Sequence, residues 1–266
     1  MKGKHILIAF ITTVVLGVLS ILSLKFVDKF TLNDFLTKDW YIGYSSDDFN
    51  PTIYKLAHTN KDLKKIDKLV FEGFPYSVEI QEGEDGLNVY GLKEDMNYEE
   101  FFSYEVKDKT LYVRGKSLNE DLVKKYKPYL IFSVARPRDL EIEAKSISKN
   151  ISLKAPIKSL KIGSLVGYAE IEAPMEKLEI DKLIGVADIE TRDSFDMDFG
   201  EVSGVLDFEI ESFNANLEVE KVLGVMTVMD YNVLSPGWEK SYGYGSGNER
   251  DTIKIGKLTG VLTVED

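Results

Sequence analysis

Carboxylates are the side chains with the most obvious chemical potential in this chain of 266 residues. Aspartate and glutamate number 45 against 33 lysines and arginines, which gives a net charge of −12. Two carboxylates across a groove would suit a glycan hydrolase or lyase. With carboxylates this abundant, however, their presence does not distinguish an enzyme from an acidic surface.

Other catalytic groups are scarce. The chain has no cysteine and two histidines, His5 and His58, so there is no thiolate nucleophile and a histidine-based acid, base or metal site is not supported. His58 stands in a polar stretch and is predicted to lie on the surface. The sequence therefore predicts no catalytic residue, no metal site, no cofactor and a protein that is not an enzyme.

Some carboxylates recur at fixed positions of a repeat. They form three pairs: Glu170 with Glu172, Asp188 with Glu190, and Asp207 with Glu209. Neighbouring strands lie about 4.8 Å apart, so like charges in register should repel. Two interpretations are open: a divalent cation or cationic partner lies along these columns, or the carboxylates are solvated and relieved by Lys182, Lys221 and salt. The net negative charge argues against nucleic acid as a partner.

An aromatic, glycine-rich segment, residues 231–250, is predicted to be a loop. Its Trp238, Tyr242 and Tyr244 could stack on a sugar or a peptide. The alternative is a mobile connection, or a cap over the end of the repeats. The run Gly243–Gly247 lacks the lysine and the helical context of a phosphate-binding loop.

The repeat itself is an apolar, polar, apolar triplet followed by a glycine and an alternating apolar strand. Its glycines are separated by 18, 19, 20 and 36 residues. A short repeat with strand periodicity predicts an all-β fold, a β-solenoid (single-chain β-helix) with coils of about 18–20 residues. Each glycine should take a positive φ at a corner. The five glycines are Gly167, Gly185, Gly204, Gly224 and Gly260.

Counting the first apolar residue as zero, positions 0, 2, 5, 9, 11 and 13 should point inward. Strand alternation then turns position 8 outward. That position holds Tyr168, Val186, Val205, Val225 and Val261, and position 6 adds Val166, Ile184 and Leu223. A continuous apolar patch usually marks an interface. Alternatively, the segment before residue 135 covers these side chains, or a bulge at the glycine turns them inward.

The N-terminus carries an uncharged run from Ile6 to Leu24. Nineteen helical residues nearly span the hydrocarbon core of about 30 Å, which predicts a transmembrane signal anchor. The rival, a cleaved signal peptide, usually has a shorter apolar region and an A-x-A-like site. Lys2 and Lys4 precede the run, so the positive-inside tendency places the C-terminal domain outside the cytoplasm of a single-pass cell-membrane protein.

The predicted organisation has four parts. Residues 1–24 are the cytoplasmic N-terminus and membrane anchor, and 25–65 a juxtamembrane segment. Residues 66–135 are a strand-rich part of the ectodomain, and 136–266 the solenoid repeats.

Several segments together resemble the bacterial "putative adhesin" domain family of unknown function. They are KIDKLVFEGFPYSVEIQEGEDGLNVYG, KTLYVRG, LIFSVARPRDLEIEA, the glycine-centred repeats and GYGSGNERDTIKIGKLTGVLTVED. The resemblance covers roughly Lys65 to Asp266 and implies a β-solenoid tethered by one membrane helix, with adhesion as its activity and no catalytic residues. In this chain valine mostly follows the repeat glycine, where the family commonly has a small polar residue.

These observations predict a membrane-anchored, extracytoplasmic, non-catalytic binding or adhesin-like protein of the cell envelope. The expected partners are the membrane through the N-terminal helix, an envelope protein or a glycan, and a second copy of the chain. Two alternatives stay open: a regulatory ectodomain that senses envelope stress, and a glycan-acting β-helix enzyme.

Overall fold

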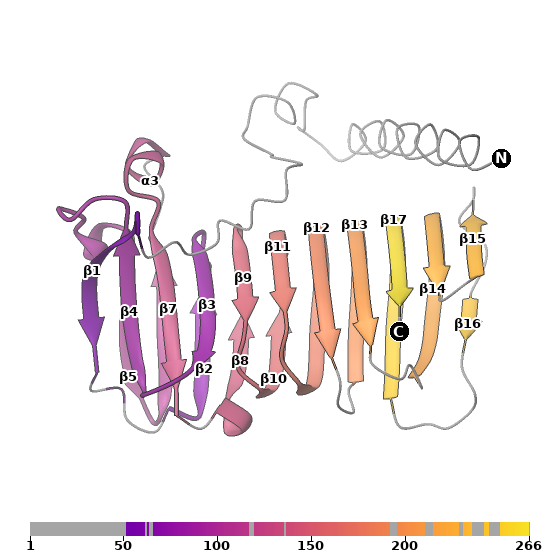
Figure 1. Cartoon of the computed structure of the whole chain (residues 1–266), viewed down its shortest axis with the longest axis horizontal. Helices are drawn as coiled ribbons and strands as arrows, with labels where there is room; N and C mark the ends of the chain where they lie inside the picture. Colours follow the sequence, from indigo (N-terminus) through magenta and orange to yellow (C-terminus); the bar gives the residue numbers. More distant parts are fainter. Residues whose placement is uncertain are drawn as a thin grey trace.

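The protein, seen in a computed structural model, is all-β, and its strands stand side by side along the long axis (Figure 1). The structure describes residues 52–61, 63, 66–116, 120–135, 137–191, 196–210, 215–228, 231–235, 242–244 and 251–265. Its elements are β1 (Lys55–Asn60), β2 (Lys68–Glu72), β3 (Ser77–Glu82), β4 (Gly86–Gly91), η1 (Tyr98–Glu100), β5 (Phe102–Lys107), β6 (Thr110–Gly115), α3 (Glu120–Tyr126), β7 (Tyr129–Val134), η2 (Pro137–Asp139), β8 (Glu141–Ala144), β9 (Asn150–Leu153), β10 (Ile157–Ile162), β11 (Leu165–Ile171), β12 (Met175–Thr191), β13 (Asp196–Ile210), β14 (Ala215–Val228), β15 (Tyr231–Ser235), β16 (Tyr242–Tyr244) and β17 (Asp251–Glu265).

The apolar positions of the repeats pack into continuous inward ladders. Leu160 of β10 pairs in parallel with Leu178 of β12, which pairs with Met197 of β13, and all three side chains are fully buried. The same ladder continues backwards through Ile142 to Leu69. Burial of such side chains, worth about 25 cal/mol per Å² of apolar surface, holds these strands together. The predicted inward positions are confirmed.

The repeat glycines form a second ladder, the glycine column: Gly167, Gly185, Gly204, Gly260 and Gly224 in spatial order. Their φ angles lie between 141° and 156°, so the predicted positive φ is confirmed. A Cβ on Gly204 would stand 1.8 Å from the carbonyl oxygen of Gly185. Glycine is therefore required at this column by both backbone conformation and close approach.

The spatial order of the last repeats departs from their order in the chain. β17 pairs in parallel with β13 on one side and with β14 on the other. β14 is displaced outward, where β15 and β16 pair with it in antiparallel fashion. The glycine-rich segment after β14 therefore contains two strands.

The predicted fold class, a β-solenoid, is corrected by this topology, while the transmembrane helix predicted before it lies outside the described residues. The strands form one 17-stranded sheet, curled like a half-barrel or jelly roll. It mixes parallel and antiparallel pairs, and β17 inserts between two earlier repeats. The reason is that a repeated pattern fixes which residues pair, whereas it does not fix the order in which equivalent strands stack.

The N-terminal part builds on the same sheet. β2 pairs with β8, and β3 with β9, so residues before 136 join the ladder of the repeats directly. Antiparallel partners follow: β4 on β7, β1 on β4 and β5 on β6. Phe71, Phe74, Tyr76 and Phe102 pack here ring against ring, with Phe74 centroids 5.2–5.9 Å from the other three. The helix α3 lies between β6 and β7 in this part of the chain.

Within the described ranges, no helix is long and apolar enough to cross a membrane. The predicted membrane segment, Ile6–Leu24, lies outside them, as do the N-terminal charges that set its predicted orientation.

Candidate binding face

Five predicted site residues form one line on the outward side of the sheet, here named the valine ladder. Tyr168 pairs with Val186, Val186 with Val205, Val205 with Val261, and Val261 with Val225. All five side chains are half-buried, whereas the inward positions beside them are fully buried. Position 6 is less regular, because Ser203 and Thr259 separate Ile184 from Leu223.

The acidic columns lie next to the valine ladder and are named the acidic ladder: Glu170, Asp188 and Asp207, with Glu172, Glu190 and Glu209. Glu170 pairs with Asp188, Asp188 with Asp207, and Glu190 with Glu209, so the predicted register is confirmed. Alternate residues of a strand share a face and lie about 6.6 Å apart. Apolar and acidic side chains therefore run in parallel along one outward face.

The two ladders are linked by Tyr168. Its hydroxyl donates a hydrogen bond of 3.3 Å to Oδ2 of Asp188 on the next strand. At the same end, the Ser152 hydroxyl donates to Oε2 of Glu170 at 2.8 Å. These bonds hold the first carboxylates of the ladder in place.

Mutual repulsion along the acidic ladder is visible at Glu172. Burial raises the pKa of this carboxyl, and the neighbouring charges of Glu170, Glu190 and Asp188 raise it further, while Lys154 acts in the opposite direction. Because the shift is upward, burial and the carboxylates together outweigh the lysine. A cation placed along this ladder would meet favourable electrostatics.

The strands β2, β8, β10 and the first half of β12 have a different charge pattern. There, lysine and glutamate alternate across neighbouring strands and form ion pairs: Lys68–Glu143 at 2.6 Å, Lys158–Glu141 at 2.5 Å and Lys161–Glu179. Two lysines share Glu179, with Lys177 at 3.4 Å. These strands thus carry paired charges of opposite sign, whereas the acidic ladder carries carboxylates opposite one another.

Sequence reasoning missed one functional-looking pair, Glu79 and Tyr129. Glu79 of β3 pairs with Ser152 of β9, which pairs with Glu170 of β11, so Glu79 lies in line with the acidic ladder two strands before its first carboxylate; its side chain is 6% exposed. The Tyr129 hydroxyl donates to its Oε2 at 3.2 Å, and Lys154 lies 3.5 Å away. The signal was in the sequence: counted from Leu69, Glu79 occupies position 10 of an unrecognised earlier repeat.

The remaining predicted residues lie elsewhere. Trp238 lies outside the described residues, while Tyr242 and Tyr244 belong to β16 and pair with Val219 and Leu217 of β14. They are therefore on the strand that borders β14, at the far end of the sheet from β1 (Figure 1).

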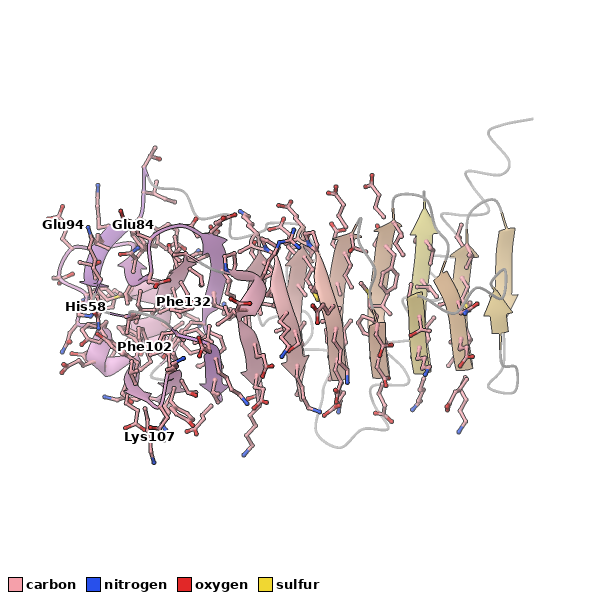
Figure 2. All side chains as sticks on the ribbon, turned by 90° about the horizontal axis from the view of Figure 1, so that it is seen from below. His58, Glu84, Glu94, Phe102, Lys107 and Phe132 are labelled. Atoms are coloured by element: carbon pink, nitrogen blue, oxygen red, sulfur yellow. The ribbon has the colours of Figure 1, made fainter. Side chains whose placement is uncertain are left out.

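His58 lies in β1, at the end of the sheet farthest from β15 (Figure 1), where Figure 2 also labels Phe102. Rather than projecting freely from the surface, its ring stacks on Tyr98 with centroids 4.1 Å apart. Its Nε2 is 2.8 Å from the Tyr104 hydroxyl. Burial lowers the pKa of His58, and Glu99 opposes this shift.

Catalytic geometry is not assembled at either ladder. Across the described ranges, no group of three or more His, Cys, Asp or Glu side chains is placed to hold a metal ion. A hollow of about 510 Å³ lined by Glu72, Gly73, Lys145 and Ser146 brings a single carboxylate to its wall. The outward face offers a long surface on which apolar and acidic side chains run in register.

Comparisons with known proteins give limited support. No protein-family model and no curated protein matches the chain. Similar solved structures include a "putative cell adhesion protein" from Clostridium sporogenes, 17% identical with a TM-score of 0.41, covering 80% of this chain and 98% of that one. A "putative adhesin" from Bacteroides fragilis is 15% identical with a TM-score of 0.32, covering 80% and 96%. A "putative lipid binding protein" from Parabacteroides distasonis is 12% identical with a TM-score of 0.29, covering 80% and 96%. TM-scores below 0.5 leave the function to be argued from the residues of this chain.

Proposed function

We propose that this chain is a non-catalytic, adhesin-like binding protein that docks its partner on the valine ladder and the acidic ladder together. The observation that supports the proposal is their register: half-buried apolar side chains on five strands run beside carboxylates on three of them. A continuous apolar strip on a protein surface usually marks an interface.

The partner is defined by complementarity. Apolar side chains would cover the valine ladder, and basic side chains flanking them would face the acidic ladder. An anionic surface would be repelled by the same carboxylates and by the net charge of −12. We therefore propose a protein or peptide strand with alternating apolar and basic residues as the partner class.

Binding of a defined probe tests this. A synthetic peptide with alternating leucine and lysine should bind the purified chain, and one with leucine and glutamate should not. Because the acidic ladder is exposed, affinity should fall as salt rises toward 0.5 M. The measurement is fluorescence anisotropy of the labelled peptide.

Variants locate the site. Val186→Lys with Val205→Lys should lower the affinity for the basic peptide at least tenfold, because the two substitutions place cations in the valine ladder. Ile53→Lys with Val106→Lys is the matched control, since those apolar side chains are 53% and 50% exposed, and Ile53 precedes β1 while Val106 lies in β5. An equal loss of peptide affinity in the two double variants would contradict the proposal. So would an unchanged affinity in both of them. Val186→Thr with Val205→Thr gives a milder change should the lysines disturb folding.

We also propose that the protein acts as a single-pass protein of the cell membrane with its C-terminal domain outside the cytoplasm. The support is the uncharged run Ile6–Leu24 after Lys2 and Lys4. Protease added to intact spheroplasts should digest the domain. Complete protection would overturn the orientation, and a soluble released form would indicate a cleaved signal peptide.

A further inference from the structure

A column of mostly basic side chains flanks the valine ladder on the side opposite the acidic ladder, and it is named the lysine column. Its members pair in the spatial order Lys182, Glu201, Lys257 and Lys221. Three lysines and one glutamate give the column a net charge of +2. On β12, Lys182 stands four residues before Val186 and Glu190 stands four residues after it. The valine ladder therefore runs midway between a basic column and an acidic one.

The outward residues on the basic side of this face match the partner class proposed above. On β12 they are Lys182, Ile184 and Val186, and on β14 they are Lys221, Leu223 and Val225. Both lysines are exposed, and the apolar residues beside them are half-buried. A basic residue followed by alternating apolar ones is the pattern that the acidic ladder and the valine ladder require. The chain thus carries a complement to its own face.

The order of the bands decides how two copies would meet face to face. A half-turn about the line of the valine ladder lays the lysine column of each copy over the acidic ladder of the other. Lys182 then faces Glu190 of the second copy, and Val186 faces its own equivalent. A half-turn about β13 would instead set Asp207 and Glu209 against their own equivalents. Because like charges across an interface are costly, the charge pattern selects the first arrangement.

Two contacts in the selected arrangement are unfavourable. Glu201 would face Glu209 of the second copy, and Ile184 would face Asp188. Glu201, however, has Lys182 on one side of it in the lysine column and Lys257 on the other. These lysines offset its charge within the same copy. The net attraction between a column of charge +2 and a ladder of carboxylates is therefore retained.

The size and spacing of the face also suit a second copy. From the lysine column to the outer carboxylates the face is about 30 Å wide, and five strands make it about 24 Å long. Its footprint is thus roughly 700 Å² on each copy, and specific interfaces bury about 1,200–2,000 Å² in total. A second copy repeats its side chains at the same spacing of about 4.8 Å. The same contacts therefore recur from strand to strand.

We propose that the partner of this face is a second copy of the chain, in a two-fold dimer whose valine ladders pack together. The lysine column of each copy covers the acidic ladder of the other. The inference rests on the proposed function, because it uses the same docking face and names its partner. Sheets that pack face to face in this way lie about 10 Å apart.

Exchanged charges test the arrangement in the full chain, prepared with two different tags. Lys182→Glu places a carboxylate opposite Glu190 of the second copy, and Glu190→Lys places a cation opposite Lys182. Each variant alone should lower co-precipitation of its other-tagged copy at least fivefold. A mixture of the two variants should recover co-precipitation to within twofold of the wild type, because both contacts then join opposite charges.

Lys107→Glu is the control, a charge reversal at an exposed lysine of β5, close to the end of the sheet where His58 lies (Figure 2). It should leave co-precipitation unchanged. Absence of co-precipitation in the wild type, or no recovery in the mixture of folded variants, would overturn the dimer. Binding of the basic peptide without co-precipitation would overturn the dimer alone and leave the proposed docking face standing, whereas loss of both would overturn both.

A crosslink tests the same dimer without any change of charge. The chain has no cysteine, so Val205→Cys introduces a single thiol on the rotation axis, where it faces its own equivalent. A bismaleimide with a reach of about 10 Å should join two copies through this residue. Val106→Cys, at a side chain that is 50% exposed on β5, should give at least fivefold less crosslinked dimer. Equal yields from the two variants would overturn the proposal.

Discussion

The hydroxyl of Tyr129 donates a hydrogen bond of 3.2 Å to Oε2 of Glu79, a carboxylate that is almost fully buried. Burial raises the pKa of Tyr129, and the negative charge of Glu79 raises it further, so the phenol stays protonated and remains a donor. The pair anchors the N-terminal end of the acidic ladder on strands β7 and β3.

Removal of this donor should destabilise the fold. Tyr129→Phe leaves the buried carboxylate of Glu79 short of a hydrogen bond, which typically costs about 1–3 kcal/mol in the free energy of unfolding. Adding Glu79→Gln should recover part of the loss, since a neutral amide is cheaper to bury. Urea denaturation measures both. Tyr112→Phe on β6 is the control, and an equal loss there would count against a specific role for the pair.

The glycine column gives a second prediction. Gly204→Ala should lower the free energy of unfolding by about 2 kcal/mol or more, because its φ of 151° disfavours a Cβ and the Gly185 carbonyl oxygen lies 1.8 Å from it. Gly83→Ala is the control, with its nearest contact at 3.4 Å to Ser133. Similar thermal stability for the two variants would show that the column tolerates side chains.

The acidic ladder should make stability depend on pH. The pKa of Glu172 is raised in the folded state, so its ionised form is disfavoured there. The contribution of Glu172 to the stability of the fold is therefore fully present below its unfolded pKa near 4.5. This contribution is lost as the pH rises through the higher pKa that Glu172 has in the folded state. Glu172→Gln should raise Tm at pH 7 and have little effect at pH 4. A Tm difference that is equal at both pH values would contradict this origin.

Thr191 provides a stabilising substitution. Its side chain is 2% exposed, and its hydroxyl oxygen has no hydrogen-bond partner in the part of the chain that the structure describes. Thr191→Val replaces the hydroxyl by a methyl of similar shape, so stability should rise by about 1 kcal/mol. Thr191→Ser, which keeps the hydroxyl and removes the methyl, should lower it. Calorimetry of the wild-type protein and the two variants measures these changes in stability. A lower stability of Thr191→Val would show that the hydroxyl has a hydrogen-bond partner after all.

Local pairing was predictable from the sequence, and the spatial order of strands was not. Leu178, Gly185 and Val186 each stand in the predicted register with Met197, Gly204 and Val205, because alternation and the glycine spacing determine which residues meet. The position of β17 was missed because its repeat fits beside β12, β13 or β14 equally well by apolar pattern. The register of the apolar and glycine positions is the same in each of these arrangements.

The candidate face was predictable in part for the same reason. The valine and acidic ladders follow from strand alternation, whereas Glu79 was missed because the repeat around Leu69 lacks the marker glycine. The surroundings of His58 could not be predicted, since Tyr98 and Tyr104 reach it from a segment about 40 residues away. Such contacts depend on tertiary packing and leave no periodic signal.

The inserted position of β17 also bears on how the chain is made. During synthesis β14 leaves the ribosome before β17, at a time when β13 is free to pair with it. The growing chain can therefore close early in the wrong neighbour order and must reopen that ladder when β17 arrives. In that early closure Asp198 would face Glu218, and Glu201 would face Lys221. The order β13, β17, β14 can therefore be completed only after the last strand has been synthesised.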